Sequence, residues 1–166
     1  RLVVFLEPIA LYLMRDLHAD KDGGWMRRYP APDQRLPFGS VGIDGEGQDL
    51  AIVTYGNGRY LSQQAAPALQ KAGLALRIID LRWLAPLPEA ALLEAVQGCK
   101  RVLVVDECRR SGNIAEALMA LLAEAGHTSA RITAEDSFIA TGPAYAATMP
   151  SCEGITRAAL DLMGRE

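Results

Sequence analysis

Five consecutive charged or reactive side chains follow a short apolar run, and they are the densest chemistry in the chain. They are Asp106, Glu107, Cys108, Arg109 and Arg110. Adjacent carboxylates raise one another's pKa when both are enclosed, and cationic neighbours favour the thiolate form of a cysteine. The two arginines oppose the carboxylate shift, however, and no histidine is near in sequence to act as a base. We therefore interpret the run as a solvated or interface-forming charged loop rather than a catalytic set.

Two further segments carry groups that bind charged ligands. Asp80 and Arg82 are two residues apart, so on an extended chain they project to the same side. They either pair with each other to fix a loop or leave Arg82 for a ligand, and the structural ion pair is the preferred interpretation. Residues 56–58 follow an apolar run and offer amides to an anion at a helix start. This G-x-G lacks the third glycine and the downstream acidic residue of a dinucleotide fingerprint, so a plain tight turn is preferred.

The histidines and cysteines do not form a recognisable site. Cys99, Cys108 and Cys152 are odd in number and lack a C-x-x-C, which favours reduced thiols in a cytoplasmic protein over a disulfide or zinc framework. His18 has acidic neighbours without a closing metal spacing, and His127 falls just past a helix end. We assign no catalytic, cofactor-binding or metal role in this chain. The structural or interface candidates are Asp80, Arg82, Asp106, Glu107, Arg109 and Arg110.

Composition excludes two classes of partner. The 17 basic and 20 acidic residues give a net charge of −3, and neither end carries a polybasic patch, so we expect no nucleic-acid partner. The longest apolar run, residues 117–123, is far too short to cross a bilayer, so we expect no membrane association.

From residue 49 the pattern predicts the elements that position these side chains. Short apolar strands alternate with helical patterns, which is typical of a parallel sheet covered on both faces. A short strand at 41–43 joins its edge. Ser111 and Ser151 are the predicted N-caps of the last two helices, and Pro67 predicts a kink or a late start in the first. The predicted strands are 50–55, 74–79, 102–105 and 130–133, and the apolar positions of the predicted helices fall within 61–72, 88–96, 114–125 and 155–162.

The residues before this pattern have a different character. Residues 2–6 are an unbroken apolar run that ends at Glu7 and Pro8, which predicts a buried strand. Because such a strand needs neighbours to pair with, we expect it to complete an upstream domain. A polar stretch rich in glycine and proline follows, with the composition of a long connection.

Several segments occur together in the order and spacing of one known family. They are residues 5–12 (FLEPIALY), 37–39 (PFG), 49–56 (DLAIVTYG), 79–87 (IDLRWLAPL), 104–107 (VVDE) and the helix start at 111–112 (SG). Over nearly its whole length the chain thereby resembles the beta subunits of 2-oxo-acid dehydrogenases of the pyruvate and branched-chain type, which depend on thiamine diphosphate.

The resemblance implies a fold and a division of the chain. The fold is a three-layer αβα sandwich whose five-stranded, mostly parallel sheet has one antiparallel edge strand, as in transketolase C-terminal domains. Residues 1–6 would be the last strand of an upstream pyrimidine-binding domain, residues 7–37 a connecting segment and residues 38–166 the C-terminal domain. Residues 13–35 and 141–150 differ from the family's usual pattern.

The resemblance also implies a role in a larger enzyme. The whole protein would oxidatively decarboxylate a 2-oxo acid with thiamine diphosphate and magnesium and pass the acyl group to a lipoyl arm. This C-terminal part would bind no coenzyme and would be inactive alone, serving homodimer assembly, contact with the upstream coenzyme-binding domains and docking of the lipoyl acyltransferase component. Two alternatives stay open. One is another transketolase-like enzyme, which the scarcity of histidine disfavours, and the other is a free-standing α/β regulatory module that binds an anion at residues 56–58.

Overall fold

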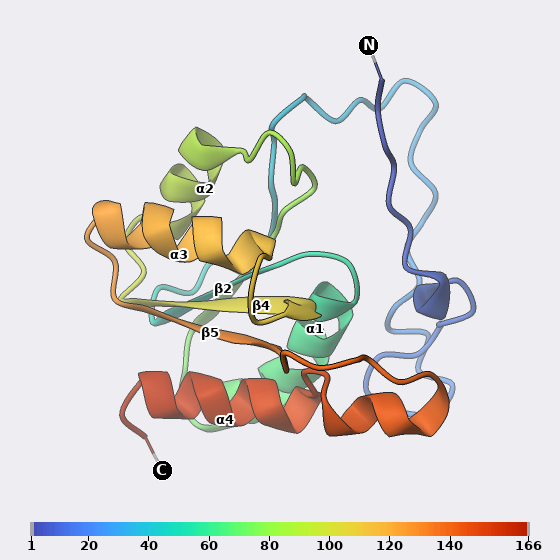
Figure 1. Cartoon of the computed structure of the whole chain (residues 1–166). Coiled ribbons are helices and arrows are strands. Elements are labelled where there is room, and N and C mark those ends of the chain that lie inside the picture. The colour runs from blue at the N-terminus through green and yellow to red at the C-terminus, as the bar shows by residue number, and fades with distance from the viewer. Residues whose placement is uncertain (1, 166) are drawn as a thin grey trace.

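A five-stranded sheet with the strand order β1-β3-β2-β4-β5 forms the middle layer of the protein. The structure is a computed structural model that describes residues 2–165. Helices α1 and α4 cover one face of the sheet, and α2 and α3 cover the other (Figure 1). The strands are β1 (Gly42–Asp44), β2 (Leu50–Thr54), β3 (Leu76–Asp80), β4 (Arg101–Arg109) and β5 (Ser129–Ala134). The α-helices are α1 (Asn57–Lys71), α2 (Glu89–Val96), α3 (Ile114–Glu124) and α4 (Cys152–Leu162), and two 3-10 helices are η1 (Ile9–Leu11) and η2 (Gly142–Ala147).

The topology agrees with the predicted fold class. Strands β2, β3, β4 and β5 pair in parallel, and β1 pairs antiparallel with β3 at one edge. A parallel connection needs a crossover, and the helix after each of β2, β3 and β4 supplies it. The αβα sandwich with one antiparallel edge strand is therefore confirmed.

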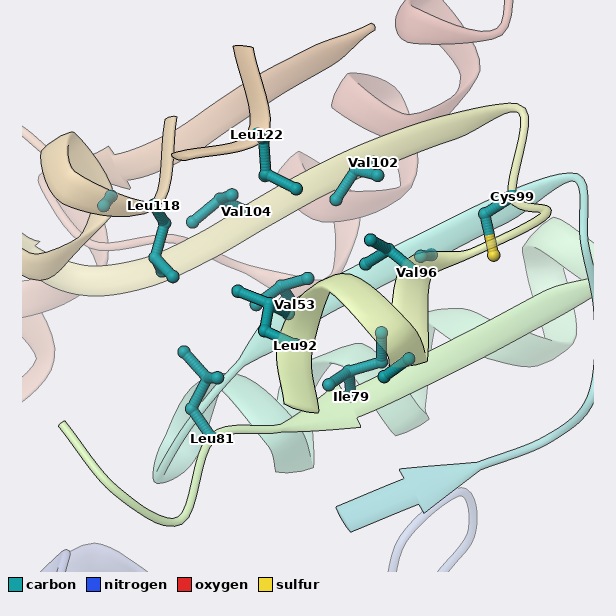
Figure 2. Packing of buried hydrophobic residues seen from close by; sticks show 13 residues of the cluster. Val53, Ile79, Leu81, Leu92, Val96, Cys99, Val102, Val104, Leu118 and Leu122 are labelled. Carbon is teal, nitrogen blue, oxygen red and sulfur yellow. The ribbon is translucent and has the colours of Figure 1, made fainter. Parts of the chain in front are cut away.

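Strand β2 lies at the centre because both of its faces are apolar. Each of its residues is buried. Ala51 and Val53 belong to the core under α2 and α3, whereas Leu50 and Ile52 belong to the core under α1 and α4. Figure 2 shows the first of these cores, where Leu92 of α2 and Leu118 of α3 lie over the strands. Such a strand is stable only between two layers of helices.

The helix boundaries correct two predictions. The late start predicted for α1 is wrong, since the helix begins at Asn57 and continues through Pro67. Pro67 lies on the exposed side of the helix, where water can satisfy the carbonyl that the ring leaves without a donor. Ser111 does not cap α3, because the Asn113 side chain accepts the Glu116 N–H instead. The predicted cap of α4 is confirmed, with Ser151 Oγ accepting the Gly154 N–H at 3.0 Å.

The largest differences from the predicted strand ends are at the start of β3 and at the end of β4. Strand β3 begins at Leu76, two residues later than predicted, and β4 continues through Arg109, four residues further than predicted. The extension of β4 carries residues 106–109 out of the predicted loop and into the sheet. It reaches beyond the part of β4 that pairs with β2, and a register shift separates Val105 from Arg109 in the pairing with β5.

The first residues of the chain run at the carboxyl end of the sheet (Figure 1). Residues 2–6 form no strand in this chain, and their side chains are exposed, with Phe5 at 81%. Their place in an upstream domain stays a prediction. Among the helices of the described residues, the longest has 15 residues, and none combines the length and apolar character needed to cross a membrane.

Candidate functional site

The strand order of the sheet reverses between β2 and β4, so the carboxyl ends of these two strands form its switch point. These two strands are neighbours, but the helix after β2 packs on one face and the helix after β4 packs on the other. In open α/β sheets this divergence makes a crevice in which ligands bind. Residues 54–58 and 106–111 border it here, so it is the first place to look for a site.

Asp106 fills the α3 side of this crevice and is fully buried. One carboxyl oxygen accepts the Tyr55 hydroxyl at 2.7 Å and the Cys108 N–H at 2.8 Å. The other accepts the Ala115 N–H at 3.1 Å, in the first turn of α3. The predicted solvated loop is therefore wrong for Asp106. Because its three donors come from three separate segments, the hydrogen bonds of this carboxylate link β2, β4 and α3.

Tyr55 forms the β2 side of the same contact. Burial, followed by the hydrogen bond to Asp106, raises the pKa of the tyrosine, so its hydroxyl remains a donor at physiological pH. Cys108 is exposed, with its Sγ 3.6 Å from the Tyr55 hydroxyl. The arrangement holds two strand ends together, and no histidine takes part in it.

Glu107 points to the opposite face of β4. Leu103 and Val105 lie in the core under α1, and strand alternation places Glu107 on that side, next to Asn57 at the start of α1. Burial raises its pKa from 4.5 to about 7, the Asp106 charge adds to the rise and the Asn57 side chain opposes it. Mutual perturbation of the adjacent carboxylates was considered from the sequence, with the two arginines expected to oppose it. The arginines do not contribute at Glu107 because they lie nearer to Asp136.

The turn at residues 56–58 packs tightly and already uses two of the amides at the start of α1 internally. Gly58 N–H donates to the Tyr55 carbonyl at 3.0 Å, and Arg59 N–H donates to the Gly56 carbonyl at 3.2 Å. A Cβ on Gly58 would lie 2.2 Å from Thr54 Oγ1, so glycine is required for α1 to approach β2 this closely. With Glu107 beside it, the turn is poorly suited to an anion. It is the tight turn that the sequence analysis preferred.

Asp80 belongs to a charge cluster that the sequence analysis recognised only in part. The predicted pair with Arg82 is present at 4.0 Å from Nε to Oδ2. Arg59 of α1 makes a shorter contact to Asp80, at 3.8 Å, and also bonds Asp44 of β1 at 2.9 Å. Burial raises the pKa of Asp80, and both arginines oppose the rise. Arg59 carried no sequence signal, because its partners lie on two other elements.

Arg109 and Arg110 are exposed at the end of β4. They lie close enough to Asp136 to help lower its pKa, although the larger cause is Ser111, whose hydroxyl and N–H both donate to that carboxylate. Arg109, Ser111 and Asp136 border an open hollow of about 470 Å³, with the exposed ring of Phe138 at its rim. Of the candidate residues, Arg109, Arg110 and Arg82 are exposed to solvent.

No metal or nucleophile site is assembled from the described residues. Among residues 2–165, no three His, Cys, Asp or Glu side chains are grouped to hold a metal ion. His18 lies in an exposed loop and His127 is half-buried beyond α3. Cys99, Cys108 and Cys152 are separate free thiols, and burial raises the pKa of Cys99 and of Cys152.

Comparison with known proteins identifies the family. Residues 39–155 match the model of the C-terminal domain of transketolase. The chain belongs to the transketolase C-terminal domain family. A solved transketolase, described as a split-gene enzyme in an inactive beta4 tetramer, has the same fold, with a TM-score of 0.71 at 22% identity over 83% of this chain and 46% of that chain.

The sequence relatives include beta subunits of 2-oxo-acid dehydrogenases, as the resemblance predicted. The 2-oxoisovalerate dehydrogenase beta subunit of Bacillus subtilis is 36% identical over 95 residues, which is 57% of this chain and 29% of that subunit. The pyruvate dehydrogenase E1 beta subunit of Staphylococcus aureus is 30% identical over 122 residues, 74% of this chain and 34% of that subunit. An acetoin:2,6-dichlorophenolindophenol oxidoreductase beta subunit of Cupriavidus necator is 40% identical over 89 residues, 54% of this chain and 26% of that subunit. The chain thus spans about a third or less of the length of these relatives.

Proposed function

We propose that this transketolase C-terminal domain is the assembly and docking domain of the decarboxylating component of a 2-oxo-acid dehydrogenase complex. The whole enzyme would oxidatively decarboxylate a 2-oxo acid and transfer the acyl group to lipoyl groups, with thiamine diphosphate and magnesium as its cofactors. Its partners would be the upstream coenzyme-binding domains, a second copy of this domain and the lipoyl acyltransferase component, in the cytoplasm.

One observation carries the proposal. The match to a pyruvate dehydrogenase E1 beta subunit extends over 74% of this chain. A second match, to a 2-oxoisovalerate dehydrogenase beta subunit, supports the same class of enzyme with a different substrate. These relatives support the 2-oxo-acid dehydrogenase context but do not identify the substrate.

The chemistry of the crevice supports an assembly role over a coenzyme site. Its buried carboxylate, Asp106, accepts from three internal donors, and the Gly58 and Arg59 N–H groups of α1 donate to carbonyls of the turn. Glu107, with its pKa of about 7, adds partial negative charge near neutral pH where a diphosphate would have to approach. The described residues do not fit a diphosphate with its magnesium ion, so we derive no catalytic step from them.

The same geometry disfavours the regulatory anion-binding module. Such a module needs several unoccupied donors at the turn of residues 56–58, and the Gly58 and Arg59 N–H groups there already donate to carbonyls of the turn. The exposed arginines, Arg109 and Arg110, offer a better contact for a partner, since they lie outside this internal network.

Two titrations of this chain test the proposal. In the first, thiamine diphosphate with magnesium is added in a calorimeter, and we expect no saturable heat, because the crevice lacks suitable donors. Saturable binding would contradict the assembly role. In the second, the small binding domain of a lipoyl acyltransferase is added, and we expect saturable binding.

A matched pair of variants locates the docking contact. We expect Arg110→Ala to weaken binding of the acyltransferase domain by about tenfold, the effect of one interface arginine worth about 1.4 kcal/mol. Arg101→Ala, at the opposite end of β4, serves as the control and should leave binding unchanged. If the two variants weaken binding equally, the carboxyl end of β4 is not part of the docking surface.

A further inference from the structure

The long connection before the α/β domain contains a loop that is ordered by its own side chains. In residues 15–25, the Asp22 carboxylate accepts four backbone N–H groups at 2.7 to 2.9 Å, from Leu17, His18, Ala19 and Gly24. Asp16 accepts two more at 2.9 Å, from Lys21 and Gly23. The loop closes where the Trp25 N–H donates to the Arg15 carbonyl at 2.9 Å. A segment whose amides are satisfied in this way does not need a helix or strand to be ordered.

This loop is fastened to the outer side of α1. The Trp25 ring meets the Tyr60 ring edge-on, with 5.0 Å between centroids, and the Arg59 guanidinium lies 5.7 Å from the Trp25 ring. Leu17 is buried against the domain. These are apolar and cation–π contacts that hold the loop from one side.

Two hydrogen bonds from the same helix add to these contacts. The Tyr60 hydroxyl donates to the Asp16 carbonyl at 3.0 Å, and Gln64 Nε2 donates to the Leu17 carbonyl at 3.0 Å. Both acceptors belong to the loop and both donors to α1, so the loop cannot pivot without breaking them. Arg59 also binds Asp44 and contacts Asp80, which ties the attachment to β1 and β3.

The flanking parts of the connection are not held in this way. Residues 26–38 are exposed throughout. On the other side, residues 2–6 are exposed, and Pro8 is the nearest point to the domain: a Cβ at Gly56 would lie 3.3 Å from Pro8 Cγ. The fixed loop thus lies between the exposed residues 26–38 and a short preceding turn, residues 8–14, which is closed by hydrogen bonds from the Leu11, Tyr12 and Met14 N–H groups.

We propose that residues 15–25 are a rigid joint, which fixes the direction in which the preceding chain leaves the α/β domain. Because the joint is ordered in advance, a domain attached to residues 2–14 would dock without the entropy loss of ordering a flexible linker. This role is independent of which reaction the whole enzyme performs. It gives the least regular part of the sequence a mechanical function.

Nuclear magnetic resonance of this chain tests the joint directly. We expect the backbone order parameters of residues 16–24 to match those of α1, at about 0.85, and those of residues 27–37 to fall below about 0.6. The residual dipolar couplings of residues 9–12 should fit the same alignment tensor as the four α-helices. Order parameters of residues 16–24 as low as those of 27–37 would overturn the proposal.

A pair of isosteric substitutions gives the matched control. Asp22→Asn replaces one acceptor oxygen by an amide, so two of the four N–H groups lose their acceptor. We expect the couplings of residues 9–12 to shrink at least about twofold in this variant, with α1 unchanged. Asp33→Asn makes the same chemical change in the open segment and should leave every coupling as it was. A rigid joint is excluded if Asp22→Asn behaves like Asp33→Asn.

A second variant detaches the loop without changing its interior. Trypsin should cleave the native chain after Arg27, Arg28 and Arg35 but spare Arg15 and Lys21, with rates referred to those of the urea-unfolded chain. Trp25→Ala should raise cleavage after Arg15 and Lys21 by about tenfold or more, since local opening controls the rate. Rapid cleavage after Arg15 and Lys21 in the unaltered chain would overturn the proposal.

Discussion

Two neighbouring carboxylates at the end of β4 have opposite environments. Asp106 faces α3 and is buried, with three hydrogen bonds from β2, β4 and α3. Glu107 faces α1 and is half-buried, with a pKa raised to about 7 chiefly by burial. The cost of burying Asp106 is offset by its hydrogen-bond donors, whereas the main effect on Glu107 is the loss of solvent around its carboxylate.

The difference follows from strand alternation. Residues 106 and 107 are adjacent in sequence, but consecutive side chains of a strand lie on opposite faces of the sheet. Adjacent acidic residues therefore do not form a functional pair when the strand continues through them. The α3 side of the crevice is held by hydrogen bonds, and the α1 side is held by the close approach of α1 to β2.

Removal of the Asp106 carboxylate should have the largest effect on the chain. Asp106→Ala leaves the Tyr55 hydroxyl and two backbone N–H groups without an acceptor in a buried place. We expect the free energy of unfolding to fall by about 3–5 kcal/mol, measured by urea denaturation near neutral pH. A loss below about 1 kcal/mol would show that water replaces the carboxylate and that the α3 side is not held by it.

The stability of the α1 side should be sensitive to added side-chain volume at Gly58. Gly58→Ala gains about 1 kcal/mol in helix propensity, but its Cβ would lie 2.2 Å from Thr54 Oγ1. Because the methyl group displaces α1 from β2, we expect a net loss of about 2 kcal/mol in the same measurement. Gly154→Ala is the control in the first turn of α4, where the nearest atom is the end of the flexible Ile132 side chain at 3.2 Å. A stabilised Gly58→Ala variant would contradict the packing argument.

Glu107 should change how stability depends on pH, with the smallest effect. The unfolded chain has the ordinary pKa of 4.5 and the folded chain about 7, so between these values the folded state binds more protons. The contribution of Glu107 is therefore complete below the lower value and is lost as pH rises toward the higher one. We expect Glu107→Gln to remove a decline of about 1 kcal/mol, reduced by partial solvent screening.

Urea denaturation at about pH 5 and about pH 8 measures this decline. The unaltered chain should lose more stability between the two conditions than Glu107→Gln does. Asp106→Asn provides the comparison, since it should lower stability at both pH values. If Glu107→Gln leaves the pH dependence unchanged, the two carboxylates do not differ in the way described.

Local patterns were sufficient to predict most of the fold from the sequence. The order of strands and helices and the Ser151 cap depend on hydrophobic periodicity and on single capping residues, whereas the antiparallel direction of the edge strand was implied only by the family resemblance. Ser111 was misassigned because Asn113, two residues later, is an equally good cap and lies directly before the helix. The kink-or-late-start prediction at Pro67 underestimated how well an exposed helix face tolerates the ring.

The site depended on contacts between distant residues, which local patterns do not contain. Tyr55 and Asp106 are 51 residues apart, and Arg59 meets Asp44 across 15. One available signal was missed: continuing the period-two pattern of Val102 and Val104 by one step places Asp106 on the buried face. The Asp22 loop had a signal too, since aspartate and glycine clusters favour hydrogen-bonded turns.

The doubly buried strand β2 couples the two cores of the domain mechanically. Its successive residues belong to different cores, so neither core can come apart while the other keeps β2 in register. We therefore expect the two hydrophobic cores to melt in one transition, so that the calorimetric and van't Hoff enthalpies of the α/β part agree. A destabilising substitution on the α3 side therefore lowers the stability of the α1 side as well, so a substitution in either helical layer changes the stability of the whole domain.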